Sequence, residues 1–258
     1  MVDARQAPAT ATDTSIFWQQ NSAANSANFM QSQIATPPSP ILNLLTRPEP
    51  TWTYIKQAEQ DAGVLPDGKS RPLLVILGLN GTLIHRKNKG SASKARPRLY
   101  EFLEYLLHYH KSSARPENVE AMCTQLFTPE QRAQLVAVWA RDKLRLTDDQ
   151  YSQRVQVYKQ LSWVWRDDHI TDAWAQDNTV LIDDSVDKGA SEPYNLIKID
   201  AFEGTPEQLE TDVLGQVVGY LEVLKRARDV SACTKRAPYF YKTGHPAFDW
   251  LPIMSEMH

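Results

Sequence analysis

The sequence is poor in cysteine, because Cys123 and Cys233 are the only two among its 258 residues. Two cysteines cannot form the disulfide framework of small secreted domains, and this favours a reducing compartment. Long apolar runs are also missing, since the longest, such as Leu73 to Leu77, are far shorter than the roughly 18 residues that a membrane-spanning helix requires. We therefore expect an intracellular protein, in the cytoplasm or nucleus, with no membrane span in this chain.

An excess of positive charge is absent as well. The chain has 28 Lys and Arg against 31 Asp and Glu, a formal net charge of -3 and a pI of about 6.1. Binding of nucleic acid without sequence preference requires a basic face, so we expect no nucleic-acid partner. The hydrophobic content of 42% is sufficient for one full domain core.

Glycine is absent from the first 50 residues, which carry only five charged side chains and are rich in Ala, Ser, Thr, Gln and Pro. Such a composition cannot bury enough apolar surface to offset the entropy lost on ordering. We predict a disordered low-complexity tail over residues 1–50, a folded domain over residues 51–230 and an aromatic C-terminal tail over residues 231–258. The aromatic tail is expected to fold back on the domain, because exposed aromatic clusters are a liability.

Two apolar segments predict the central strands of a sheet. Residues 72–77 are almost entirely aliphatic without polar alternation, which is typical of a parallel strand covered on both faces. Residues 178–183 form a second such strand, which ends in the paired carboxylates of Asp183 and Asp184. Open α/β sheets place their ligand crevice at the carboxyl ends of the strands. Both carboxylates are therefore candidate site residues, and capping of the next helix is a compatible alternative.

The turn after the first strand contains Gly78, Asn80, Gly81 and Thr82. Gly81 permits a tight turn, and Thr82 places a hydroxyl beside it. A strand followed by Asn-Gly-Thr is also an ordinary strand-turn, and a glycine at a strand end also serves a bulge or a close backbone approach. The turn alone leaves these interpretations open.

Other segments predict helices and loops around the sheet. Apolar residues recur at helical spacing over residues 98–107 and again over the long segment 206–228. Lys159 follows an alternating stretch that includes Val155 and Val157, so it is expected on a strand face, just beyond it or in a loop. A solvated surface lysine is the common alternative.

The first predicted helix leads through His108 and His110 directly into Ser112, with no apolar strand between them. Either Leu106 to His110 unwinds to supply a strand, or the chain lacks one strand of the sheet. The two histidines could suggest a metal pair, but we interpret them as a polar, partly exposed edge at the helix end.

In this order the segments resemble the four motifs of the haloacid dehalogenase superfamily, especially its branch related to the phosphatases of the RNA polymerase II C-terminal domain. The turn at residues 78–83 is similar to the first motif, Asp-x-Asp-x-Thr-Leu, and Ser112 to the hydroxyl of the second. Lys159 is similar to the lysine of the third motif, and Asp183-Asp184-Ser185 to the fourth. The resemblance covers roughly residues 70–202 and implies an α/β fold, a three-layer sandwich with a mostly parallel sheet.

The resemblance also implies a chemistry that this chain lacks. In active relatives the first aspartate attacks phosphorus and the second is the general acid and base, but here these positions are Gly78 and Asn80. Magnesium is the cofactor of the relatives, and loss of a ligand at Gly78 argues against its binding here. The remnant site that the resemblance implies has three phosphate-binding residues, Thr82, Ser112 and Lys159, and two residual metal ligands, Asp183 and Asp184.

The size of each loss predicts the activity. General acid-base assistance contributes about 10² to 10⁴ in rate, whereas removal of a covalent nucleophile costs on the order of 10⁶ in a protease example. We expect a degenerate phosphatase domain without useful turnover that acts by binding phosphorylated protein. The alternative is a non-catalytic interaction protein, similar to the receptor subunit of the mitochondrial inner-membrane presequence translocase, with translocase subunits as partners and a mitochondrial location.

Overall fold

The computed structural model describes most of one compact unit, which spans Leu44–His258. The described residues are 46–87, 92–114, 123, 126–135, 137–138, 147–152, 156–168, 170, 174–242 and 248–257. The predicted tail over residues 1–50 therefore lies almost entirely outside them. Arg47, near its end, is described and pairs with Asp187 at 3.1 Å.

Strands and helices alternate along most of the chain. The strands are β1 Leu74–Leu77, β2 Ile84–His85, β3 Lys94–Ala95, β4 Lys111–Ala114, β5 Ala137–Val138, β6 Thr179–Asp183 and β7 Leu196–Lys198. The α-helices are α1 Trp52–Ala58, α2 Leu99–Tyr109, α4 Pro129–Ala133, α5 Asp148–Ser152, α6 Leu161–Trp165, α7 Pro206–Leu209, α8 Val213–Leu224, α9 Val230–Arg236 and α10 Leu251–Met257. Short 3-10 turns cover Pro66–Gly68, Val186–Gly189 and Pro193–Asn195.

Five strands form one sheet in the order β5-β4-β1-β6-β7, and every pairing in it is parallel. The predicted apolar strands are β1 and β6, which lie side by side at its centre with every residue buried. Strands β2 and β3 form a separate antiparallel pair beyond the end of β1. The α/β fold with a parallel sheet is thereby confirmed.

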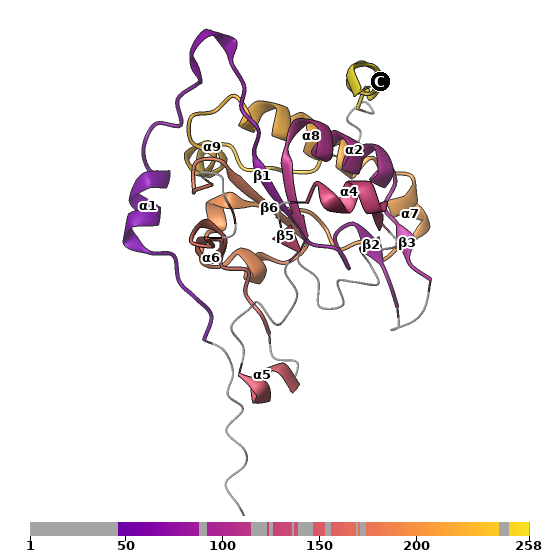
Figure 1. The fold of residues 1–258 in the computed structure, drawn as a ribbon, viewed down its shortest axis with the longest axis horizontal. Helices are drawn as coiled ribbons and strands as arrows, with labels where there is room; N and C mark the ends of the chain where they lie inside the picture. Colours follow the sequence, from indigo (N-terminus) through magenta and orange to yellow (C-terminus); the bar gives the residue numbers. More distant parts are fainter. Residues whose placement is uncertain are drawn as a thin grey trace, which may run out of the picture. The chain divides into compact units, whose positions relative to one another are not determined.

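The two faces of β1 belong to different cores, which makes the fold a three-layer sandwich. Leu73, Val75 and Leu77 pack with the apolar faces of α2 and α8, whereas Leu74 and Ile76 pack with α6. Figure 1 shows the sheet between these two sets of helices. The uninterrupted apolar composition of β1 follows from this burial on both sides.

The second strand of the sheet is present, contrary to the two alternatives expected from the sequence. Helix α2 continues to Tyr109, and β4 begins at Lys111 with no loop between. Residues Lys111-Ser112-Ser113-Ala114 themselves pair with β1, from Leu74 opposite Lys111 to Leu77 opposite Ala114. The sequence did not predict this strand, because it contains no large apolar residue. Its pairing with β1, and not side-chain hydrophobicity, defines it.

His110 is buried at the end of α2, so its prediction as a partly exposed edge was wrong, whereas His108 is exposed. The His110 Nδ1 atom accepts a hydrogen bond from the Leu73 backbone at 3.1 Å. The proton therefore resides on Nε2, which lies 3.0 Å from the hydroxyl of Tyr105. Tyr105 in turn donates to Glu222 at 2.8 Å. His110 thus joins the end of α2 to the start of β1 and to α8.

The predicted helix over residues 206–228 is two helices, α7 and α8. The break falls before Asp212, whose side chain accepts from the Gly215 backbone at 2.8 Å and caps α8. Its second oxygen accepts from the indole of Trp250 at 2.8 Å. The interruption therefore lets one aspartate cap a helix and hold the aromatic segment at the C-terminus.

The C-terminal aromatic segment folds back on the domain, as expected. Trp250 is buried, and Tyr239, Tyr241 and Phe248 pack against the larger core. The predicted boundary at residue 231 is not a structural one, because it falls inside α9, where Ser231 is fully buried. Within the described part of the chain, no helix has the length and hydrophobicity needed to cross a membrane.

Acid should destabilise this fold through His110. Burial, with a smaller contribution from Lys225, lowers the pKa of His110 from 6.5 to about 4 in the folded protein. The unfolded chain then binds more protons between these values, so the stabilisation is complete above pH 6.5 and disappears as the pH falls to about 4. We expect a loss of up to about 3 kcal/mol in the free energy of unfolding across this window, measured by urea denaturation at several pH values.

The control for this prediction is the exposed His108. His108→Gln should keep the wild-type pH dependence, whereas His110→Gln should start from a lower stability and lose less of it on acidification. An equal slope in the wild type and His110→Gln between pH 6.5 and 4 would contradict the assignment.

Candidate functional site

The site lies where the central strands β1 and β6 end next to each other. Leu77 is opposite Ile182 in the register, and the Gly78 backbone donates to the Ile182 carbonyl at 2.8 Å. Gly78 is therefore level with Asp183. The parallel pairing brings together the first and fourth motifs, which are about a hundred residues apart in the sequence.

The turn after Gly78 brings Gly81 and Thr82 next to the carboxylate of Asp184. Gly81 has a φ of 84°, a left-handed value that favours glycine, and a Cβ there would lie 2.8 Å from an Asp184 oxygen. The turn places the fully buried Thr82 beside the carboxylates. Its hydroxyl donates to Asp184 Oδ1 at 2.8 Å.

Gly78 extends the hydrogen bonding between β1 and β6 by one residue. Its φ is outside the positive region, so a left-handed backbone is not the reason for glycine here. The space that a side chain would need is filled, however. A Cβ atom at Gly78 would lie 2.7 Å from Asp183 Oδ2 and closer still to Thr82 Oγ1. A side chain at position 78 would therefore require the side chains of Thr82 and Asp183 to move.

Asn80 lies on the surface of the turn and has a structural partner. Its side-chain oxygen accepts a hydrogen bond from the Arg86 backbone at 2.9 Å. An amide neither gains nor loses a proton near neutral pH. In this structure Asn80 therefore stabilises the turn and supplies no general acid or base.

Lys159 reaches the site from the loop that precedes α6, and not from a strand face. Its side chain is only 8% exposed, and its ammonium group lies 2.5 Å from Asp183 Oδ2. The other Asp183 oxygen accepts from the Ser185 backbone at 3.0 Å. Lys159 is therefore no solvated surface lysine, because it neutralises a carboxylate that is itself 3% exposed.

Ser112 is not level with the other predicted phosphate ligands. It pairs with Val75 near the start of β4, three residues before the level of Gly78. Three strand residues span about 10 Å. The structure thus brings together Thr82, Lys159 and the two aspartates, whereas the register keeps the Ser112 backbone away from them.

Arg96 is a site residue that the sequence reasoning missed. The buried guanidinium donates to the Thr82 carbonyl at 2.7 Å and to the Asp200 carbonyl at 2.7 Å, and it lies over the ring of Phe202. Burial lowers the pKa of Arg96 to about 10, so it is still charged at neutral pH. No motif or periodicity identified it, because its partners are backbone carbonyls that only folding brings near.

Asp184 is the more open of the two carboxylates. Burial raises its pKa, the neighbouring Asp183 raises it further, and the hydrogen bond from Thr82 partly offsets both effects. Asp184 also accepts the only hydroxyl proton that Thr82 can donate. Each carboxylate of the site thus has an internal partner, Lys159 for Asp183 and Thr82 for Asp184.

The residues present fit a magnesium ion poorly. Magnesium is usually bound by one or two carboxylates together with waters and substrate oxygens, but of the two carboxylates here Asp183 is held by the ammonium group of Lys159 and Asp184 accepts from Thr82. Gly78 adds no side-chain ligand. An internal ammonium group therefore supplies positive charge at Asp183.

Two positions of the first motif carry no side chain with the chemistry of the active relatives. Gly78 has no side chain that could act as a nucleophile, and the amide of Asn80 exchanges no proton near neutral pH. What remains is a closed network of an ammonium group, two carboxylates, a hydroxyl and a guanidinium at the end of a parallel sheet.

Comparison with known proteins was made at the level of family, sequence and structure. Residues 73–231 match the family model described as NLI interacting factor-like phosphatase. A protein of Schizosaccharomyces pombe (strain 972), described as an uncharacterized FCP1 homology domain-containing protein, is 36% identical over 234 residues. The match covers 81% of this chain and 93% of that relative.

Two solved structures are also similar to the chain. One is described as fission yeast RNA polymerase II CTD phosphatase Fcp1-R271A bound to beryllium fluoride, with 14% identity and a TM-score of 0.37. The other is described as Fcp1, an essential RNA polymerase II CTD phosphatase, with 16% identity and a TM-score of 0.37. Each match covers 80% of this chain but only 63% of the solved chain.

Removal of the Lys159 ammonium group should destabilise the fold strongly. Lys159→Ala leaves the buried Asp183 without its cation, and loss of one partner of a buried ion pair costs about 3 to 5 kcal/mol. Urea denaturation at neutral pH measures this loss as a change in the free energy of unfolding. Adding Asp183→Asn to Lys159→Ala should recover part of it, because no unpaired buried charge then remains.

The matched control is Lys198→Ala, which breaks an exposed pair with Asp200 whose side chains are 44% and 79% exposed. Exposed pairs contribute about 0 to 1 kcal/mol, so this variant should stay near the wild type. If Lys159→Ala cost no more than Lys198→Ala, the ion pair would have no structural role.

Proposed function

This chain belongs to the NLI interacting factor-like phosphatases, within the haloacid dehalogenase branch related to RNA polymerase II C-terminal-domain phosphatases, and we propose that it is a catalytically silent protein-binding domain. The reason is that glycine stands at the position of the family's nucleophile. The observation that carries the proposal is the missing side chain at Gly78, where even a Cβ atom would lie 2.7 Å from Asp183 Oδ2 unless that side chain moved.

A domain of this family can lose phosphatase activity and still keep its fold. β1, β6 and the turn need burial, backbone pairing and the Lys159–Asp183 contact, and none of these requires catalysis. The site residues that remain therefore have a structural reason to be present. A domain that keeps a stable surface without turnover is suited to binding another protein.

Binding of a phosphorylated partner through its phosphoryl group is less well supported than binding of a partner without one. Thr82 is fully buried and donates its proton to Asp184, while Lys159 is directed at Asp183. A phosphate would have to compete with both carboxylates for these donors and would meet their negative charge. We therefore propose protein binding that does not depend on phosphorylation, and phosphoprotein binding is the alternative that experiment must separate from it.

The purified protein should show no phosphatase turnover above a mock preparation. p-Nitrophenyl phosphate and a phosphoserine peptide, each with magnesium, are the substrates, and release of nitrophenol or phosphate is the measurement. The physical reason is the missing side chain at Gly78, whose loss removes on the order of 10⁶ in rate by analogy with other covalent nucleophiles. Activity that is present in the wild type, absent from the mock preparation and abolished by Asp184→Ala would refute the proposal.

Calorimetric titration should reveal no binding of inorganic phosphate, sulfate or a phosphoserine peptide at the motif site. The reason is that Thr82 donates its only hydroxyl proton to Asp184, while the buried ammonium group of Lys159 is paired with Asp183. Lys198→Ala is a control for unspecific effects of removing an ammonium group, since Lys198 is an exposed lysine of β7. If phosphate binds and Lys159→Ala weakens it about ten- to a hundredfold, as loss of a charge-assisted contact would, the phosphoprotein alternative is correct.

A further inference from the structure

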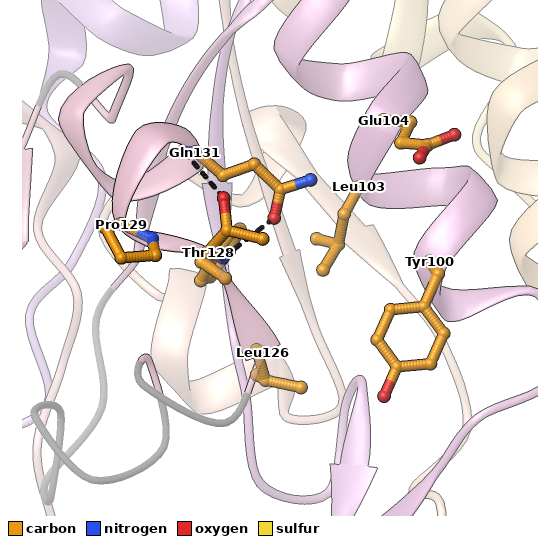
Figure 2. A pocket seen from close by; sticks show the side chains of 8 residues that line it. Tyr100, Leu103, Glu104, Leu126, Thr128, Pro129 and Gln131 are labelled. Atoms are coloured by element: carbon orange, nitrogen blue, oxygen red, sulfur yellow. Dashed lines mark hydrogen bonds between the residues drawn. The ribbon is translucent and has the colours of Figure 1, made fainter.

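A pocket of about 440 Å³ lies between one face of α2 and the segment that leads into α4. Figure 2 shows it from close by, with Tyr100, Leu103 and Glu104 on the α2 side and Leu126, Thr128, Pro129 and Gln131 opposite. Its volume lies in the lower part of the range of small ligand sites, roughly 300 to 1,000 Å³. None of its lining residues belongs to the motif site described above.

The wall formed by α4 is held rigid by its own hydrogen bonds. Thr128 accepts from the Gln131 backbone at 3.2 Å, and the Gln131 side-chain oxygen accepts from the Thr128 backbone at 3.0 Å. This capping box closes the start of the helix, and Figure 2 draws both bonds. Pro129 follows Thr128 and further restricts the backbone there. The wall is thus formed before any ligand arrives.

The floor of the pocket is apolar. Leu103, Leu126 and Phe127 are buried and belong to the larger core. The pocket therefore offers a hydrophobic surface of side chains that are fixed by the packing behind them. An apolar side chain of a partner can be desolvated on this floor without any rearrangement of the core.

The rim has one unpaired negative charge beside an exposed aromatic ring. Tyr100 is 61% exposed, and Glu104 follows it by four residues, so both point from the same face of the helix. Among the described residues that line the pocket Glu104 is the only charged one, and its carboxylate forms no ion pair or hydrogen bond with any described residue. Glu101, one turn away, is already paired with Arg98 at 2.9 Å.

These features select one kind of occupant. A guanidinium or ammonium group placed beside Glu104 gains an ion pair, and the face of Tyr100 attracts the same cation. The alkyl stem of an Arg or Lys covers apolar surface, and the volume leaves room for a neighbouring apolar side chain. An acidic segment would be repelled by Glu104, and a purely apolar one would leave its carboxylate partly desolvated without a partner.

We propose that the pocket between α2 and α4 binds a short segment of a protein partner in which an Arg or Lys side chain adjoins an apolar residue. The cation lies between Tyr100 and Glu104, and the apolar side chain packs on Leu103, Leu126 and Phe127. This proposal rests on the proposed protein-binding function and gives it a surface and a partner chemistry. It does not depend on the state of the motif site.

The test is an NMR titration of the full-length, ¹⁵N-labelled protein with three capped dipeptides, Ac-Arg-Leu-NH₂, Ac-Gln-Leu-NH₂ and Ac-Glu-Leu-NH₂. The arginine dipeptide should shift the amides of residues 100–104 and 126–131 in a saturable way, should bind more weakly in high salt and should bind tighter than the glutamine dipeptide. The glutamate dipeptide should bind most weakly. Glu104→Gln and Tyr100→Ala should each weaken the arginine dipeptide about two- to fivefold, the size of an exposed ion pair or cation–π contact.

Glu101→Gln is the matched control, since Glu101 lies on the same helix, does not line the pocket and already has a partner. It should bind the arginine dipeptide as the wild type does, and unchanged spectra away from the pocket confirm that each variant is folded. Equal binding of the three dipeptides, unchanged affinity in Glu104→Gln, saturable shifts located elsewhere or no saturable shift up to the solubility limit would each overturn the proposal. Failure here leaves the phosphatase assays unaffected, so loss of the pocket and loss of the silent-domain proposal are distinguishable.

Discussion

The parallel pairing of β1 with β6 is the constraint on which the rest of the structure depends. Its register, with Leu77 opposite Ile182, makes Gly78 and Asp183 neighbours although the chain between them is long. The burial of both strands on both faces fixes this register, because a shift of one residue would exchange the side chains that face α2 and α8 with those that face α6. The site geometry is thus a consequence of core packing.

The same pairing gives the motif residues a structural role that does not depend on catalysis. Asp183 is buried by the sheet and would be costly without a cation, and Lys159 supplies that cation. Thr82 is buried by the turn, and Asp184 satisfies its hydroxyl. These contacts therefore offset the cost of burying the polar motif side chains. Their presence indicates the family, whereas the chemistry depends on positions 78 and 80.

The sequence predicted what hydrophobicity and short-range pattern determine. β1, β6 and α2 were predicted correctly, since each has an apolar pattern. The residues of the first, third and fourth motifs meet at the strand ends, whereas Ser112 of the second does not join them. β4 could not be recognised, because its residues are polar or small and only the edge of β1 defines it. Arg96 and His110 were missed or misjudged for a related reason, since their partners are backbone groups and side chains that folding alone brings close.

A polar side chain that already has a hydrogen-bond or ionic partner within the protein is less available to a ligand than one that has none. At the motif site the donors of Lys159 and Thr82 are used internally, so a ligand must first break contacts that stabilise the fold. At the pocket beside α2 the floor is packed and the capping box is closed, while the carboxylate of Glu104 has no partner among the described residues. A ligand there breaks no hydrogen bond or ion pair among the described residues that line the pocket, provided the capping box stays closed. We therefore expect a ligand to bind more favourably at the pocket than at the motif site, where it must first replace internal contacts.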